Sequence, residues 1–126
     1  MIQEKQMSGP HLDLKNLIIL IKEEKDLKAN LILDEGCQLA VSDPKPLIKI
    51  LNYVINYLNQ LTESPLEIGL DLRDQEYLLN MMAFSPANEL PSVSDNLKQA
   101  LQEFKATYEV KHEKGSYIQF IIKFQR

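Results

Sequence analysis

Apolar side chains recur along this chain with two periods, one of three to four residues and one of two. The longer period indicates amphipathic helices, because it places the apolar side chains on one helix face. It runs through residues 13–25, through residues 44–62 and through the stretch that follows Ser94 and Asp95. Asp13, Asp43 and the Ser94–Asp95 pair can each cap a helix, and Pro44 suits a first helical position. The pattern predicts three helices.

The shorter period indicates strands with one buried face. It covers residues 29–33, 37–41, 66–72, 76–84, 107–113 and 117–124. Turn residues between these segments, such as Asp34-Glu35-Gly36 and Lys114-Gly115-Ser116, predict three β-hairpins. The stretch Ser85–Pro91 contains two prolines and is expected to be a loop.

One helix followed by two strands occurs three times in succession. This order predicts an α/β (α+β) sandwich in which three helices pack on one face of a mixed, largely antiparallel sheet. The chain has 126 residues, the usual size of one domain. We therefore expect a single domain over residues 12–126, after a flexible lead-in over residues 1–11 that ends in a Ser-Gly-Pro-His sequence.

Composition narrows the function classes. The net charge is -4 and the basic residues are dispersed among the acidic ones, so nucleic acid is not the expected partner. The apolar runs are too short to cross a membrane, and the first residues lack a signal-peptide core, so a cytoplasmic location is expected. A single cysteine, Cys37, and two histidines give no metal-ligand spacing. A protein partner is the expectation that remains.

The element order, together with specific residues, resembles the ATP-binding domain of sensor histidine kinases and of the wider GHKL family, a Bergerat-like fold. The resemblance covers residues 12–124. The closing turn of the family is matched by Lys114–Phe120. The family's long helix has the form D-x3-L-x2-V-L, which is matched without a gap by Asp43, Leu47, Ile50, Leu51, Val54 and Ile55.

The nucleotide-binding residues of the family are poorly matched. Where the family has two asparagines on the long helix, the second of which holds magnesium, this chain has Tyr53 and Tyr57. A register shifted by one residue places Asn52 and Asn56 there, so that Asn56 is the alternative magnesium position. That shift moves apolar side chains out of the buried helix positions, and the unshifted register is preferred.

The positions of the glycines are a second indication that the family's nucleotide-binding motifs are missing. The four glycines are Gly9, Gly36, Gly69 and Gly115, so none lies between residues 70 and 114, where the family has its glycine boxes and nucleotide lid. The stretch 82–88, which corresponds to the family motif D-x-G-x-G, contains neither aspartate nor glycine. The resemblance therefore implies an ATP-binding fold that has lost its nucleotide motifs and lid, with no cofactor, no metal and no catalytic residue.

Tyr53, Tyr57 and Gln60 share one helix face, which the resemblance directs toward the former nucleotide pocket. Met82 and Phe84 are expected to meet them there. These side chains either plug the pocket, form a patch for a partner, or simply pack in the core.

Three functions stay open at this point. One is a non-catalytic interaction module of two-component-type signalling, whose partner is a response regulator or a kinase or phosphotransfer protein. The alternative is a divergent ATP-binding histidine kinase or anti-sigma kinase domain. The third is an assembly subunit that forms a homodimer through an exposed sheet edge.

Overall fold

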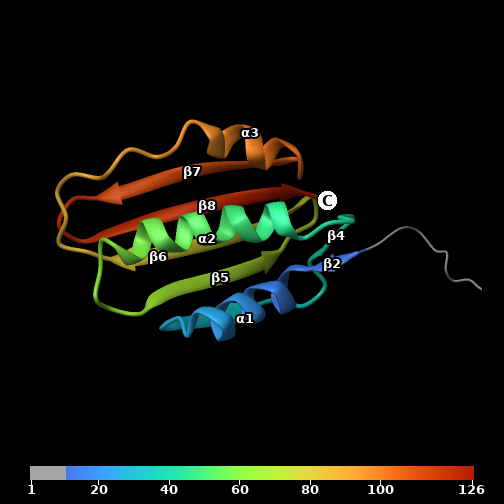
Figure 1. Ribbon diagram of the computed structural model, residues 1–126, viewed down its shortest axis with the longest axis horizontal. Coiled ribbons are helices and arrows are strands. Elements are labelled where there is room, and N and C mark those ends of the chain that lie inside the picture. The colour runs from blue at the N-terminus through green and yellow to red at the C-terminus, as the bar shows by residue number, and fades with distance from the viewer. Residues whose placement is uncertain (1–10) are drawn as a thin grey trace, which may run out of the picture.

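Three helices lie on one face of a five-stranded sheet in this computed structural model, which describes residues 11–126 (Figure 1). The helices are α1 (Leu14–Lys25), α2 (Lys45–Asn59) and α3 (Asn96–Gln102). The sheet has the order β3-β5-β6-β8-β7 and consists of β3 (Ala29–Leu33), β5 (Leu66–Leu72), β6 (Glu76–Phe84), β7 (Ala106–Glu113) and β8 (Tyr117–Gln125). The predicted fold class is confirmed. The expected lead-in lies outside the described residues, apart from His11.

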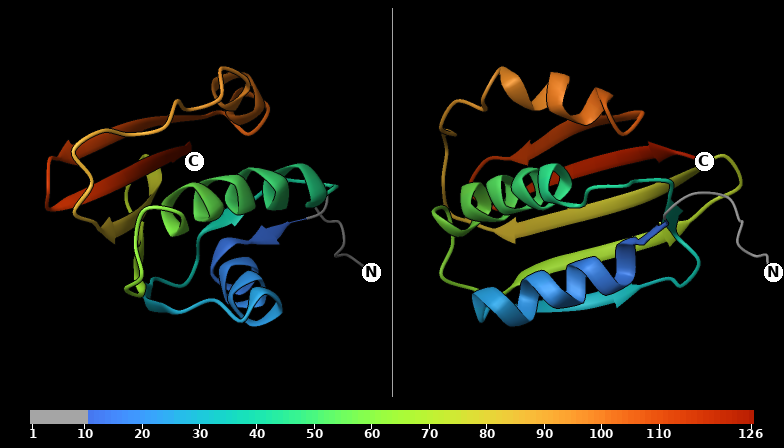
Figure 2. Two further views of the ribbon diagram at one scale, coloured as in Figure 1. Left: turned by 60° about the vertical axis from the view of Figure 1, so that its left-hand side comes forward. Right: turned by 45° about the vertical axis from the view of Figure 1, so that its right-hand side comes forward.

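The sheet is mixed. β5 and β6, β6 and β8, and β7 and β8 pair antiparallel, whereas β3 pairs parallel with β5. Two of the three predicted hairpins, β5–β6 and β7–β8, are therefore confirmed. The parallel pair requires a crossover, which α2 provides on the helix-covered face. Figure 2 shows α2 lying across the middle of the sheet in both views.

The first predicted hairpin is wrong. After β3 the amide of Asp34 donates to the carbonyl of Leu70 (2.9 Å), and its carboxylate accepts from the amide of Leu72 (2.8 Å). The chain thus continues along β5 instead of folding back on β3. Gly36, with φ of 91°, then turns it toward β4 (Gln38–Leu39), which pairs antiparallel with β2 (Leu12–Asp13) in a separate two-stranded sheet.

Helix boundaries differ slightly from the pattern. Asp13 caps α1 as expected, because its carboxylate accepts from the amide of Asn16 (3.2 Å). α2 begins at Lys45, one residue later than predicted, and the carboxylate of Asp43 accepts from the amide of Lys45 (3.0 Å). Near α3 the hydroxyl of Ser94 accepts from the amide of Asn96 (3.2 Å). Short polar side chains thus bind amides that the first helical turn leaves unpaired.

The hydrophobic core lies between the helices and the sheet. Alternation decides which strand residues reach it, because successive side chains point to opposite faces. On β6 the side chains of Leu79, Met81 and Ala83 are buried, and on β8 Phe120 and Phe124 are fully buried. Among residues 11–126, no helix lies over the opposite sheet face (Figure 2), and we call this face the open face. Within residues 11–126, no helix has the length and apolar content that crossing a membrane requires.

Candidate functional site

Two tyrosines on α2 form the centre of the region where the sequence predicted a former nucleotide site. Tyr57 is only 4% exposed and its ring meets that of Phe120 edge-on, with 5.3 Å between centroids and 73° between planes. The ring of Tyr53 lies 6.4 Å from that of Tyr57. The ring of Tyr108, on β7, stacks with that of Phe120, with 6.1 Å between centroids and 16° between planes. Edge-on and offset ring pairs of this kind are favourable aromatic contacts.

The hydroxyls of both tyrosines bind the segment that joins β6 to α3, residues 85–95. Tyr57 donates to the carbonyl of Pro91 (2.5 Å), and Tyr53 accepts from the amide of Ser94 (2.8 Å). Leu90 and Val93 of the same segment pack against the core. The segment is thus held on α2 by polar bonds to its backbone and by apolar packing.

The start of the same segment is bound to the turn between β7 and β8. Ser85 donates its amide to the carbonyl of Ser116 (2.9 Å), and Gly115 donates its amide to that of Ala87 (3.0 Å). The ring of His112 lies 3.1 Å from the same Ala87 carbonyl oxygen. Gly115 has φ of 77°, a conformation that glycine adopts without a steric penalty. Both ends of the segment are therefore anchored to regular structure.

Burial also affects the acidity of the central phenol. Desolvation raises the pKa of Tyr57 above its ordinary value, and the neighbouring Tyr53 raises it further. The neutral phenol is therefore the stable form throughout the physiological pH range. Its proton stays available for the bond to Pro91.

The expected meeting of Tyr57 with Met82 and Phe84 is wrong. Both residues lie on the open face of the sheet, on the opposite side from the tyrosines, and Phe84 is 50% exposed. The physical reason is strand alternation: Tyr77, which begins the series of buried side chains, is followed at every second position by another buried residue. Phe120, the actual neighbour of Tyr57, was missed, although the same alternation along residues 118–124 indicates it.

Gln60 and Asn56 do not join the tyrosines either. Gln60 is exposed at the end of α2. Asn56 is also exposed, one turn before Asn59, which lines a cavity beside the end of α1 with Lys25. The side-chain oxygen of Asn52 is buried and has no hydrogen-bond partner in the described part of the chain. Within residues 11–126, no three side chains of the metal-binding types come together.

A cavity of about 320 Å³ lies between α2 and α3, next to Tyr53. One cation, Lys49, lines it, and no carboxylate does. Its wall consists of Pro46, Lys49, Ile50, Tyr53, Ser94, Asn96, Leu97 and Ala100.

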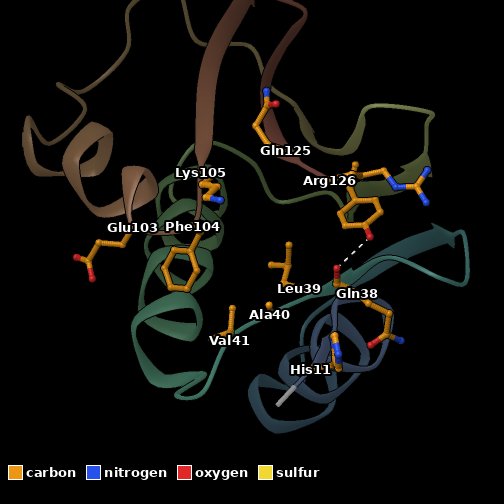
Figure 3. Close-up of a pocket in the computed structure, with 11 residues that line it drawn as sticks. His11, Gln38, Leu39, Ala40, Val41, Glu103, Phe104, Lys105, Gln125 and Arg126 are labelled. Atoms are coloured by element: carbon orange, nitrogen blue, oxygen red, sulfur yellow. Dashed lines mark hydrogen bonds between the residues drawn. The ribbon is translucent and has the colours of Figure 1, made fainter. Parts of the chain in front are cut away.

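A second cavity, of about 450 Å³, lies at the end of the sheet where β8 finishes (Figure 3). Leu39, Val41 and Phe104 give it an apolar floor. Two cations, Lys105 and Arg126, line it. The guanidinium of Arg126 lies 5.4 Å from the ring of Tyr77 and donates to the carbonyl of Arg73. Tyr77 in turn donates its hydroxyl to the carbonyl of Gln38 (2.9 Å).

The sequence matches no protein-family model and no curated protein. The fold, by contrast, closely resembles catalytic domains of bacterial histidine kinases. The histidine kinase domain of the E. coli osmosensor EnvZ aligns with a TM-score of 0.74 at 7% identity, over 98% of this chain and 92% of that one. The histidine kinase AdeS of Acinetobacter baumannii gives 0.72 at 15% identity, over 98% and 71% of the two chains.

The mycobacterial sensor histidine kinase MprB gives a TM-score of 0.70 at 12% identity, over 94% of this chain and 97% of that one. Because the alignments run over nearly the whole chain, the likeness concerns the complete arrangement of helices and strands. The chain has the histidine kinase ATPase fold.

Proposed function

We propose that this chain is a non-catalytic protein-interaction module of two-component-type signalling, a cytoplasmic domain with the histidine kinase ATPase fold that does not bind nucleotide. The observation that carries the proposal is that segment 85–95 binds the hydroxyl of the buried Tyr57. Where the family resemblance places the magnesium ligand, this chain has a buried phenol that binds Pro91 of its own backbone. A buried side chain that is bonded to its own backbone supports the loss of a metal-binding position there.

The remaining space near the tyrosines is poorly suited to a nucleotide. The cavity beside Tyr53 has the volume of a small-ligand site, but its charged lining is one lysine. A nucleoside triphosphate needs several hydrogen-bond donors or a metal ion for its phosphates, and a polar partner for its base. This lining supports a domain that acts as a scaffold and does not carry out phosphoryl transfer.

The proposed partner is another protein of the signalling system, a response regulator or a kinase or phosphotransfer protein. The support is the fold, since the structural relatives are named as histidine kinases. A domain that keeps this fold without nucleotide chemistry can still present a surface to the same proteins.

Nucleotide titration tests the proposal. A ligand that binds only the folded state at about 100 times its Kd adds roughly 2.7 kcal/mol, and about 1 kcal/mol shifts the Tm of such a domain by some 2 to 8 °C. We expect no change of Tm with Mg-ATP or Mg-ADP at millimolar concentration. The same titration in EDTA separates magnesium-dependent binding from a nonspecific effect of the nucleotide.

A magnesium-dependent rise of several degrees would contradict the proposal and support the divergent kinase domain instead. The Asn56→Ala variant would then decide whether Asn56 is the metal ligand, with Asn59→Ala as the matched control on the same helix face.

A further inference from the structure

The sheet ends at β3, a strand that has no charged residue along its whole length. Within residues 11–126, β3 pairs only with β5, so its outer edge has no partner strand. Natural edge strands are usually protected by charged side chains, by proline or by a covering element. The other edge strand, β7, follows this rule with Glu109, Lys111 and Glu113. On β3, by contrast, Ile32 is 81% exposed.

The backbone of β3 also has free hydrogen-bonding groups at this edge. The amide of Leu66 donates to the carbonyl of Lys28 (3.0 Å), and the amide of Asp34 donates to that of Leu70 (2.9 Å). In a parallel pair, the N–H and C=O groups of alternate residues point to the same neighbour, so the even-numbered residues of this stretch bind β5. The groups of the odd-numbered residues, Ala29, Leu31 and Leu33, therefore point away from the sheet.

We propose that this edge is a dimer interface, at which two copies of the chain pair through β3 in antiparallel orientation with Leu31 opposite Leu31. This register places Ala29 opposite Leu33, so the hydrogen-bonded pairs fall on the residues whose backbone groups are free. The two copies are related by a two-fold axis, which closes the assembly at two chains. The two sheets join into one continuous sheet.

The charges that flank β3 fit a second copy of the same strand. Lys28 precedes the uncharged stretch and Asp34 follows it, and both are exposed. In the antiparallel register, Lys28 of each copy lies opposite Asp34 of the other, on the same sheet face. Opposite charges directly across two strands attract, and like charges repel. A parallel, in-register pair would place lysine against lysine and aspartate against aspartate, so the charges select the antiparallel arrangement.

Exposed apolar side chains lie on the two elements at this edge. The same register sets Ile32 of each copy opposite Asn30 of the other copy and diagonal to its Ile32. Pairing therefore covers the most exposed large apolar side chain of the described residues. A two-fold axis perpendicular to the sheet places the helices of both copies on the same side. Figure 2 shows α1 over β3, and α1 carries Leu20, which is 45% exposed. Pairing thus brings Ile32 of each copy into the interface.

Analytical ultracentrifugation of the full chain and its charge-reversed variants tests this interface. The wild type should sediment with twice the mass of 14.5 kDa as its concentration rises. Lys28→Asp alone and Asp34→Lys alone each create two like-charge pairs and should weaken dimerisation by about tenfold or more. Asp34→Lys also removes the acceptor of the Leu72 amide, so Lys28→Asp is the cleaner charge reversal. A mixture of the two variants restores both opposite-charge pairs and should dimerise again. Lys111→Asp on β7 is the matched control and should leave the dimer unchanged.

Hydrogen exchange supplies a second readout that does not depend on a variant that might unfold. In the wild type the amides of Ala29, Leu31 and Leu33 should become protected as the concentration rises, whereas that of Ile32, which binds β5, should be protected throughout. A chain that stays monomeric at every concentration would overturn the proposal. The β3 edge would then be open for pairing with a different protein. The proposal would also be overturned if the charge-reversed variants dimerised as tightly as the wild type. The same holds if the mixture of the two variants failed to dimerise.

Discussion

Tyr57 stabilises the fold through two separable contacts, one made by its ring and one by its hydroxyl. Tyr57→Phe removes the hydroxyl alone and should lower the free energy of unfolding by about 1 kcal/mol, the usual net contribution of a hydrogen bond. Tyr57→Ala also removes the packing against Phe120 and should lower it by about 3 to 5 kcal/mol. Urea denaturation at neutral pH measures both. A small, equal loss in the two variants would contradict the buried position of the ring.

Cys37 is expected to make the free energy of unfolding depend on pH in the alkaline range. Its side chain is fully buried, and burial, followed by the nearby carboxylates of Asp34 and Asp13, raises the pKa of the thiol above its ordinary value of 9.0. The folded state therefore holds the thiol proton more tightly than the unfolded state. The contribution is fully present below about pH 9 and is lost as the pH rises through the pKa of the folded state.

The Cys37→Ala variant should accordingly lose less stability than the wild type between pH 8 and alkaline pH. Urea denaturation over that pH range measures the two slopes. Some slope should remain in the variant, because the pKa of Tyr57 is raised in the same direction. Identical slopes in both proteins would show that the thiol has the same pKa in the folded and unfolded states.

At the scale of elements, segment 85–95 should depend on both tyrosine hydroxyls. The double variant Tyr53→Phe with Tyr57→Phe removes the acceptor of the Ser94 amide and the donor to the Pro91 carbonyl. We expect faster amide exchange across this segment, because opening it no longer breaks these bonds. Tyr117→Phe, on β8 opposite Phe84, is the control and should leave the exchange unchanged. Unchanged exchange in the double variant would mean that packing alone holds the segment.

The elements that depend on local signals could be predicted from the sequence. The three helices, the two hairpins β5–β6 and β7–β8, and the cap at Asp13 follow from period, turn residues and capping chemistry. The partner of β3 could not be predicted in this way, because its bonds come from β5, more than thirty residues later along the chain. A turn sequence shows where the chain bends and leaves open which strand it then joins.

The candidate site could likewise be predicted from the sequence only in part. Tyr53 and Tyr57 lie near each other on α2, as the helix period indicates, and their role as a site stays a prediction. Met82 and Phe84 were assigned to the wrong face, although the alternation that starts at Tyr77 places them on the open face. The bonds to Pro91 and Ser94 could not be predicted, since loop backbone has no periodic signal.

For the whole molecule, the layered arrangement persists where residue identities do not. A TM-score of 0.74 accompanies 7% identity to the EnvZ domain, so the likeness cannot depend on shared side chains. What an apolar layer requires is total volume and pattern, which many sequences satisfy. This explains why element order and spacing were a better guide to the fold than the nucleotide motifs.

The layered arrangement predicts opposite results for two adjacent methionines of β6. Met81 is 2% exposed and faces the helices, whereas Met82 lies on the open face. Met81→Ala should lower the free energy of unfolding by about 2 to 5 kcal/mol, because it leaves a cavity in the core. Met82→Ala should change it by less than about 1 kcal/mol, since water already reaches that face. The two substitutions remove the same atoms from neighbouring positions of one strand, so strand propensity and side-chain chemistry cancel in the comparison. Urea denaturation of both variants measures the difference, and equal losses would mean that the open face is packed as tightly as the core.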